Sequence, residues 1–182
     1  MSAGHVHADA HGNKGIALLI SLLALALAFS ETLGKAEQTS ALSSNIEAAN
    51  LWAFFQAKTI RQTTLRASAD MIDALASSEA ARKQSTDLRK TAERYQSEPE
   101  TGEGRKELAD RAKKAEGARD HSLAAYHQYE LASAALQIAI VLASASIITG
   151  MVALAWVAGG LGVLGVVLCG FGFFAPNALD LL

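Results

Sequence analysis

The chain has little cysteine, little proline and no region in which one sign of charge dominates. Of its 182 residues only one is a cysteine, Cys169, and two are prolines. A single cysteine cannot form an internal disulfide or a thiolate metal site, and a thiol surrounded by apolar residues stays protonated and inert. We therefore expect no cysteine chemistry, and no cofactor or metal held by thiolates.

The chain also lacks charge in two long stretches. Residues 15–33 and 131–175 contain no lysine or arginine and a single acid, Glu31. The segment between them holds 15 of the 16 basic residues and 15 of the 18 acidic residues, with the two signs interleaved. A nucleic-acid groove or a polybasic lipid-binding patch needs one sign to dominate. We expect no nucleic-acid partner, and we expect solvated helices with mixed-charge faces in this segment.

The uncharged stretches are long enough to cross a bilayer, which takes about 20 apolar residues in a helix. We predict transmembrane helices over residues 15–33, 131–157 and 161–175, with a disordered tail over residues 1–14 and a short tail over residues 176–182. Gly159-Gly160 leaves room only for a tight turn between the last two helices. Pro176 ends the last one because proline lacks the backbone donor. The expected fold class is an all-α integral membrane protein with a C-terminal transmembrane hairpin.

The first apolar stretch has a second interpretation. Lys14 precedes it and Ala28-Phe29-Ser30 could serve as a cleavage site, so the stretch could be a secretory signal peptide. We expect a retained anchor, with the lipid bilayer as a partner.

The basic residues near the spans predict the orientation. The N-terminal tail offers only Lys14, and the hairpin tip and the C-terminal tail offer none. The central region offers Lys35, Arg111, Lys113, Lys114 and Arg119. The positive-inside rule therefore places the central region in the cytoplasm, and the predicted localisation is a bacterial inner (plasma) membrane.

The composition of the central region favours helix. Residues 36–96 contain no glycine or proline, whereas residues 97–104 contain Pro99, Gly102 and Gly104 and predict a turn. The limbs on the two sides of this turn differ by about 37 residues, or about 55 Å of helix at 1.5 Å per residue. We therefore expect residues 67–130 to form a coiled-coil hairpin with its turn at 97–104. Residues 36–65 would then form a separate assembly or interfacial helix.

That expected helix carries two apolar stripes on nearly opposite sides. The first stripe consists of Leu42, Ile46, Ala49, Ala53, Ala57 and Ile60, and the second of Leu51, Phe54, Phe55 and Leu65. A surface helix needs only one apolar face, so two faces imply contacts with two partners. The alternative is a helix buried within its own subunit. We expect homo-oligomerisation through an interface made of Ile46, Leu51, Trp52, Phe54, Phe55, Lys58 and Arg61, in which the two basic residues pair with acids such as Glu47 of a neighbouring copy.

Small residues recur at four-residue spacing in the last two spans. They allow helix backbones to approach closely, which is the main route to helix packing in lipid. The residues expected to pack the spans are Ala135, Gln137, Ala139, Ala143, Ser144, Gly150, Gly162 and Gly165. Gln137 could instead line a path for an ion or a solute. We prefer a packing hydrogen bond, since we expect no charged side chain beside Gln137 inside the spans.

No motif reaches the specificity of an active site. The sequence has no glycine-rich phosphate loop after a strand, no HExxH and no nucleophile elbow. The cluster of His5, His7 and His11 could bind a transition metal weakly, but a solvated tail is the simpler interpretation. Asp70 and Asp73 share a helical side without a pocket that would perturb their pKa values. We expect no enzymatic activity.

Two segments resemble the signatures of a bacterial membrane-protein family that is described as a domain of unknown function. Residues 50–62 read Asn-Leu-Trp-Ala-Phe-Phe-Gln-Ala-Lys-Thr-Ile-Arg-Gln, which is similar to the central motif of that family. Residues 135–144 read Ala-Leu-Gln-Ile-Ala-Ile-Val-Leu-Ala-Ser, which is similar to its second signature. The resemblance implies an N-terminal span, a helical insert and a C-terminal hairpin of spans. It implies no activity.

These observations leave two functional hypotheses. The first is a homo-oligomeric membrane scaffold or an accessory subunit of a larger membrane complex. The second is an oligomeric pore or transporter lined by the polar face of the second span, which includes Ser133, Gln137 and Ser144.

Overall fold

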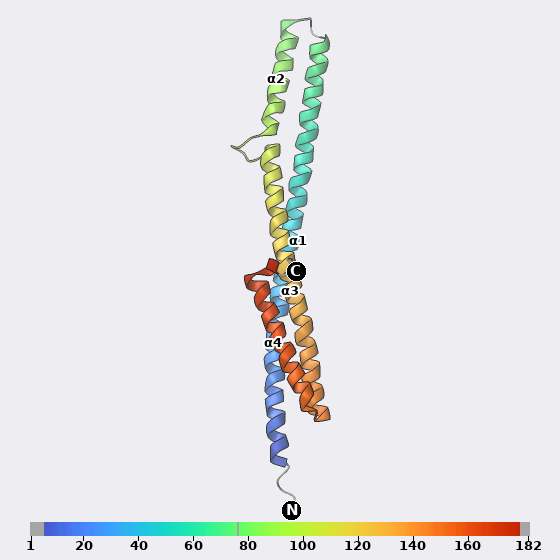
Figure 1. Cartoon of the computed structure of the whole chain (residues 1–182). Coiled ribbons are helices and arrows are strands. Elements are labelled where there is room, and N and C mark those ends of the chain that lie inside the picture. Colours follow the sequence, from blue (N-terminus) through green and yellow to red (C-terminus); the bar gives the residue numbers. More distant parts are fainter. Residues whose placement is uncertain (1–5, 76, 179–182) are drawn as a thin grey trace, which may run out of the picture. The chain divides into compact units, whose positions relative to one another are not determined.

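The computed structural model describes residues 6–75 and 77–178, with side chains from residue 14 onward. Its helices are α1 (Val6–Leu75), α2 (Glu79–Gln96), α3 (Arg105–Thr149), α4 (Val152–Phe174) and the short 3-10 helix η1 (Pro176–Ala178) (Figure 1). The described residues contain no strand, so the expected all-α fold is confirmed. Helices α1, α3 and α4 each contain a stretch that is long and apolar enough to cross a membrane.

The chain divides into two compact units. The first, called the bundle here, comprises Met1–Ala41 and Asp120–Leu182. The second, called the arm, comprises Leu42–Arg119. Helices α1 and α3 contribute residues to both units, α2 belongs to the arm, and α4 belongs to the bundle.

Small side chains fill the interior of the bundle. Leu23 of α1 packs with Leu136 and Ala139 of α3 in its apolar core. Gly162 of α4 lies so close to Leu23 that a Cβ atom would collide with that side chain. A Cβ atom at Gly165 would lie 2.7 Å from Cγ of Leu136. The three helices approach this closely because glycine and alanine leave their backbones uncovered.

The turn between the last two predicted spans is not where the sequence suggested. Gly159-Gly160 lies inside α4, which is continuous over 23 residues, and the turn lies at Gly150-Met151. Gly150 has φ +69, a left-handed conformation that glycine adopts without strain. Its N–H donates to the carbonyl oxygen of Ser146 at 2.9 Å, and the Ser146 hydroxyl donates to the carbonyl oxygen of Met151 at 3.0 Å. The predicted boundaries 131–157 and 161–175 are therefore wrong by several residues.

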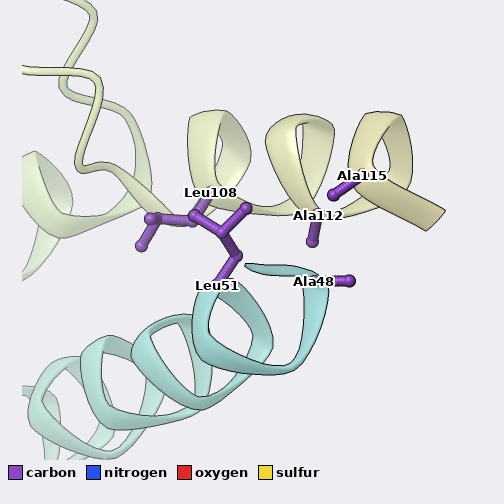
Figure 2. Packing of buried hydrophobic residues seen from close by; sticks show 5 residues of the cluster. All are labelled: Ala48, Leu51, Leu108, Ala112 and Ala115. Carbon is purple, nitrogen blue, oxygen red and sulfur yellow. The ribbon is translucent and has the colours of Figure 1, made fainter. Parts of the chain in front are cut away.

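The arm packs α1 against α2 and against the first part of α3. Its apolar core consists of Ala48, Leu51, Leu108, Ala112 and Ala115. Figure 2 shows these side chains between the two helices, with Leu51 directed at Leu108. Small residues alternate with leucine here, so the arm also packs its helices closely.

The separate helix expected over residues 36–65 does not exist, because α1 is continuous from Val6 to Leu75. The expected hairpin over residues 67–130 is also wrong. The chain reverses between Leu75 and Glu79, and α2 and then α3 return along α1 within the arm. The cause is local, since Ser78 is an N-cap whose hydroxyl accepts from the backbone N–H of Ala81 at 3.2 Å. Because the chain reverses this early, the two limbs on either side of residues 97–104 need not pair with each other. The difference in their lengths therefore needs no separate helix over residues 36–65.

The turn expected at residues 97–104 lies between α2 and α3. The Glu107 carboxylate closes this loop, accepting from the Ser97 hydroxyl at 2.6 Å and from the Glu98 backbone N–H at 3.2 Å. The hydrogen bond from Ser97 is the main cause that holds the pKa of Glu107 below its usual value.

The N-terminal end of α1 also differs from the expectation. The predicted disordered tail covered residues 1–14, but α1 begins at Val6. Helix propagation past an established segment costs little per residue, which favours this extension. Residues 1–5, including His5, and the side chains of His7 and His11 lie outside the described part of the structure.

Candidate functional site

The bundle contains an open polar cleft of about 430 Å³ between α1 and α3. The residues that line it come from both helices and include two acids, one base, two amides and four hydroxyl groups. They are Ser30, Glu31, Gly34, Lys35, Gln38, Tyr126, Tyr129, Glu130, Ser133, Ala134 and Gln137. This volume falls within the range of about 300–1,000 Å³ that is typical of small-molecule sites.

A chain of hydroxyl groups forms the floor of this cleft. Ser133 Oγ donates to Ser30 Oγ at 3.0 Å, and Ser30 Oγ donates to the backbone carbonyl oxygen of Tyr129 at 3.0 Å. Ser30 is fully buried. Such interhelical hydrogen bonds between small polar residues fix the register of α1 against α3.

A charged residue accompanies Gln137, contrary to the expectation from sequence. Gln137 Nε2 donates to Glu31 Oε1 at 3.4 Å. Glu31 is the one acid of the first apolar stretch, and its contact with Gln137 could not be predicted from local spacing because these residues are 106 positions apart. A lone acid in an apolar helix together with a lone amide in another is the signal that could have paired them.

Five of the eight residues predicted to pack the spans lie in the interior of the bundle. Ala135, Ala139, Ala143, Gly162 and Gly165 are buried in the bundle.

The remaining three packing candidates are not buried. Gln137 is exposed in the cleft. Ser144 Oγ donates to the carbonyl oxygen of Ile140 within its own helix at 2.8 Å. Gly150 is exposed and forms the turn between α3 and α4. Ser144 and Gly150 therefore make no close helix contact of the kind expected from small-residue spacing, whereas the Gln137 side chain bonds to Glu31 of α1.

The second apolar stripe predicted for assembly is used inside the arm. Leu51 is buried in the arm core, and Trp52 and Phe55 pack against that core. Trp52 Nε1 donates to Glu116 Oε1 at 2.8 Å, and the Arg105 guanidinium lies 4.9 Å from the centroid of the Phe55 ring. The chain therefore buries part of this stripe within its own arm, although residues 36–65 were expected to have no partner segment in the same chain. Phe54 remains 39% exposed.

Lys58 also has its partners inside the arm. It is 6% exposed, and its Nζ lies 3.6 Å from Glu98 Oε2 and 3.7 Å from Glu103 Oε2. The same ammonium lies over the rings of Phe54 and Tyr95, with centroids at 5.5 Å and 5.1 Å. These contacts differ from the pairing expected with Glu47 of a neighbouring copy. They tie α1 to the loop at 97–104.

The first apolar stripe faces away from the core of the arm. Leu42, Ile46 and Ile60 are 60%, 54% and 67% exposed. The three alanines between them, Ala49, Ala53 and Ala57, are exposed as well. At 100° per residue these six positions lie nearly opposite Leu51 and Gln62 on α1. We call this set the outer stripe.

Asp70 and Asp73 form an ion-pair cluster with Arg89. Arg89 NH2 lies 2.6 Å from Asp70 Oδ1 and 2.9 Å from Asp73 Oδ2. Hydrogen bonds from Ser85 and then from Arg89 lower the pKa of Asp73. This ion-pair cluster joins α1 to α2. Among the described residues, no group of three or more His, Cys, Asp and Glu side chains could hold a metal ion.

The fold defines the class of the protein. Its described residues form helices, and three of these helices are long and apolar enough to cross a membrane. Residues 12–175 match the family described as Domain of unknown function (DUF4337), and the chain belongs to this family. No curated protein and no solved structure matches the chain.

Proposed function

We propose that the chain is a three-span membrane protein that assembles with copies of itself and acts as a non-enzymatic scaffold or accessory subunit. The observation that carries this proposal is the apolar surface that the two units leave on their outside. A soluble monomer rarely exposes apolar patches beyond a few hundred Å², and larger patches mark contacts with membrane or protein.

The bundle supports the membrane part of the proposal through its inverted packing. Its buried positions are mainly alanine, glycine and serine, whereas its large apolar side chains point outward. The exposed ones include Leu18, Leu22, Leu25, Phe29, Ile138, Val141, Ile148, Trp156, Val163, Val166, Phe173 and Phe174. Lipid tails would cover these side chains, and close backbone packing would hold the helices together.

The structure also gives the first span a role that favours retention over cleavage. Ser30, the last residue of the possible cleavage site, is buried and bonded to Tyr129 and Ser133 of α3. Removing residues 1–30 would leave these polar groups of α3 without their partner. We infer a multi-pass protein of the bacterial inner membrane, with the arm in the cytoplasm as the distribution of basic residues favours.

The outer stripe supports self-assembly. Its six positions contain no charge and step by three and four residues over about 27 Å of helix at 1.5 Å per residue. Copies inserted in the same membrane are related by an axis along the membrane normal, so their α1 helices run parallel. Leu42, Ile46 and Ile60 then meet their own counterparts, and the central alanines allow close approach. A second copy of this chain is the occupant that fits.

The experiment that tests assembly is native mass measurement in mild detergent. Ile46→Glu and Ile60→Glu place a charge in the outer stripe and should lower the subunit number. Gln84→Glu is the matched control, because it adds the same charge at an exposed position of α2. An unchanged subunit number in the double variant Ile46→Glu, Ile60→Glu would contradict assembly through this stripe.

An oligomeric pore has less support. Of the three residues proposed to line it, Ser133 and Gln137 border the cleft, but the Ser144 hydroxyl donates within its own helix. Ser144 therefore does not border the cleft that Ser133 and Gln137 share.

A further inference from the structure

The cleft of the bundle has the composition of a site for a zwitterionic ligand. Glu31 and Glu130 supply two negative charges on opposite helices, and Lys35 supplies one positive charge. A simple anion would meet net negative charge, and a bare metal ion would meet the ammonium of Lys35. A ligand that carries its own cation and anion can satisfy both kinds of side chain at once.

Glu31 and Lys35 lie four residues apart on α1 and thus share one side of that helix, about 5–6 Å apart at Cβ. An ammonium and a phosphate joined by two carbons span a comparable distance. Gln137 on α3 bonds to Glu31 and adds an amide acceptor on that side of the cleft, and Glu130 adds a second carboxylate to the lining from α3. Tyr126 is half-buried at the rim.

The position of the cleft along the helices points to a lipid as the source of this ligand. Glu31 lies near the end of the apolar stretch of α1, and Glu130 immediately precedes that of α3. If the bundle spans a membrane, as proposed above, the cleft lies at the level of the lipid headgroups, where tyrosine is favoured. Resting on that proposed function, we propose that the cleft binds the phosphoethanolamine headgroup of a membrane lipid, with the ammonium at Glu31 and Glu130 and the phosphate at Lys35.

The cleft distinguishes a primary ammonium from a choline. A primary ammonium donates three hydrogen bonds, which Glu31, Glu130 and the Gln137 amide oxygen can accept. A trimethylammonium donates none and is bound through the faces of aromatic rings. The Tyr129 ring is not available for that role, because it is buried and packs against Gly172 of α4. Tyr126 is then the one aromatic ring of the lining that could face a choline, and a single ring at the rim does not enclose a trimethylammonium. The site therefore selects ethanolamine over choline.

The test uses the full chain, stripped of bound lipid in detergent and titrated with phosphatidylethanolamine, phosphatidylcholine or phosphatidylglycerol, with bound lipid counted by native mass spectrometry. Phosphatidylethanolamine should bind about tenfold more tightly than the other two, the effect of about one charge-assisted hydrogen bond. Glu31→Gln should remove this preference. Glu47→Gln, the same change at an exposed position of α1 in the arm, should keep it.

Lys35→Met gives a second signature, because both phosphatidylethanolamine and phosphatidylcholine carry the phosphate. This variant should weaken both lipids alike, whereas Glu31→Gln should weaken phosphatidylethanolamine alone. Equal affinity of the parent chain for the two lipids would overturn the headgroup site.

Extraction with alkaline carbonate after reconstitution into phosphatidylcholine vesicles tests insertion separately. A chain that resists extraction but shows no preference among the lipids retains the proposed function and loses the site. A chain that is extracted loses both.

Discussion

The bundle and the arm pack helices in opposite ways. In the bundle, small residues such as Gly162, Gly165 and Ala139 are buried, and most large apolar side chains other than Leu23 and Leu136 are exposed. In the arm, Leu51 and Leu108 are buried, and charged side chains cover most of the surface. Both units use alanine at helix contacts. The difference lies in where the large apolar residues go.

This difference fits the proposed placement of the bundle in lipid and of the arm in water. Helices in water associate by burying large apolar side chains, whereas helices in lipid gain little from doing so and rely on close backbone contact. The arm follows the first rule in its core, but it leaves large apolar side chains exposed in the outer stripe and also at Phe54, Met71 and Leu75. The outer stripe is the exception that runs along one face of α1. That exception is what makes the stripe a candidate interface and not one more solvated helix face.

The largest expected effect comes from breaking the close packing of the bundle. Gly165→Leu would drive a side chain into Leu136 and toward the Ala132 carbonyl oxygen, which lies 3.2 Å from a Cβ placed there. Overpacking by extra methylenes costs about 1–3 kcal/mol. A leucine adds four carbons at a position where not even a Cβ fits, so we expect the bundle to lose most of its stability. The thermal unfolding midpoint in detergent should fall, and assembly should weaken with it.

Gly160→Leu is the matched control for that variant. Gly160 is on the same helix, is exposed and has open space where a Cβ would lie. Its substitution should leave the midpoint nearly unchanged. Equal losses from the two variants would mean that small residues are not what holds α4 in the bundle.

The next effect sharpens the comparison within the arm. Leu108→Ala removes a fully buried side chain and should lower the free energy of unfolding by about 2–5 kcal/mol. Ile60→Ala, in the outer stripe, should change the free energy of unfolding of the monomer by less than about 0.5 kcal/mol. Its effect should appear in the subunit number instead. Chemical denaturation followed by circular dichroism at low protein concentration separates the two outcomes.

Much of this fold could be predicted from hydrophobicity and composition. The uncharged stretches identified the three apolar helices, and Pro99, Gly102 and Gly104 located the loop between α2 and α3. Those signals are local, since each depends on a residue type that favours or forbids a backbone conformation.

The pairing of helices could not be predicted in the same way. The reversal after Leu75 depends on the N-cap of Ser78, a weak signal in a segment without glycine or proline. Two glycines at 159–160 gave a stronger turn signal than the single Gly150, but both lie inside α4, where the apolar residues on either side continue the helix. The pairing of Glu31 with Gln137 follows only from the tertiary structure.

A smaller effect is expected in the loop that closes the arm. Gly104→Ala would place a Cβ against the Glu107 carboxylate and the backbone of Ser97 and Glu98, where there is no room for it. We expect a loss of about 1–3 kcal/mol from this overpacking. Gly117→Ala is the control, since that position of α3 has open space around it and should gain about 0.5–1 kcal/mol in helix propensity. Urea unfolding of both variants measures the difference.

The smallest effect is a pH dependence that should belong to the arm. Hydrogen bonds lower the pKa of Glu107, chiefly from Ser97, and that of Asp73, chiefly from Ser85. A carboxyl whose pKa is lower in the folded state stabilises the fold above its unfolded pKa, near 4.5 for Glu107 and 3.8 for Asp73, and this contribution disappears as the pH falls through the lowered value. Stability of the arm should therefore be level from about pH 7 to about pH 5 and decline below that.

Glu107→Gln should flatten the decline, because the amide still accepts from Ser97 and cannot titrate. Glu100→Gln, at an exposed acid of the same loop, should leave the decline as it is. An acid-induced decline of the same steepness in the parent and in Glu107→Gln would show that the loop carboxylate is not what couples the arm to pH.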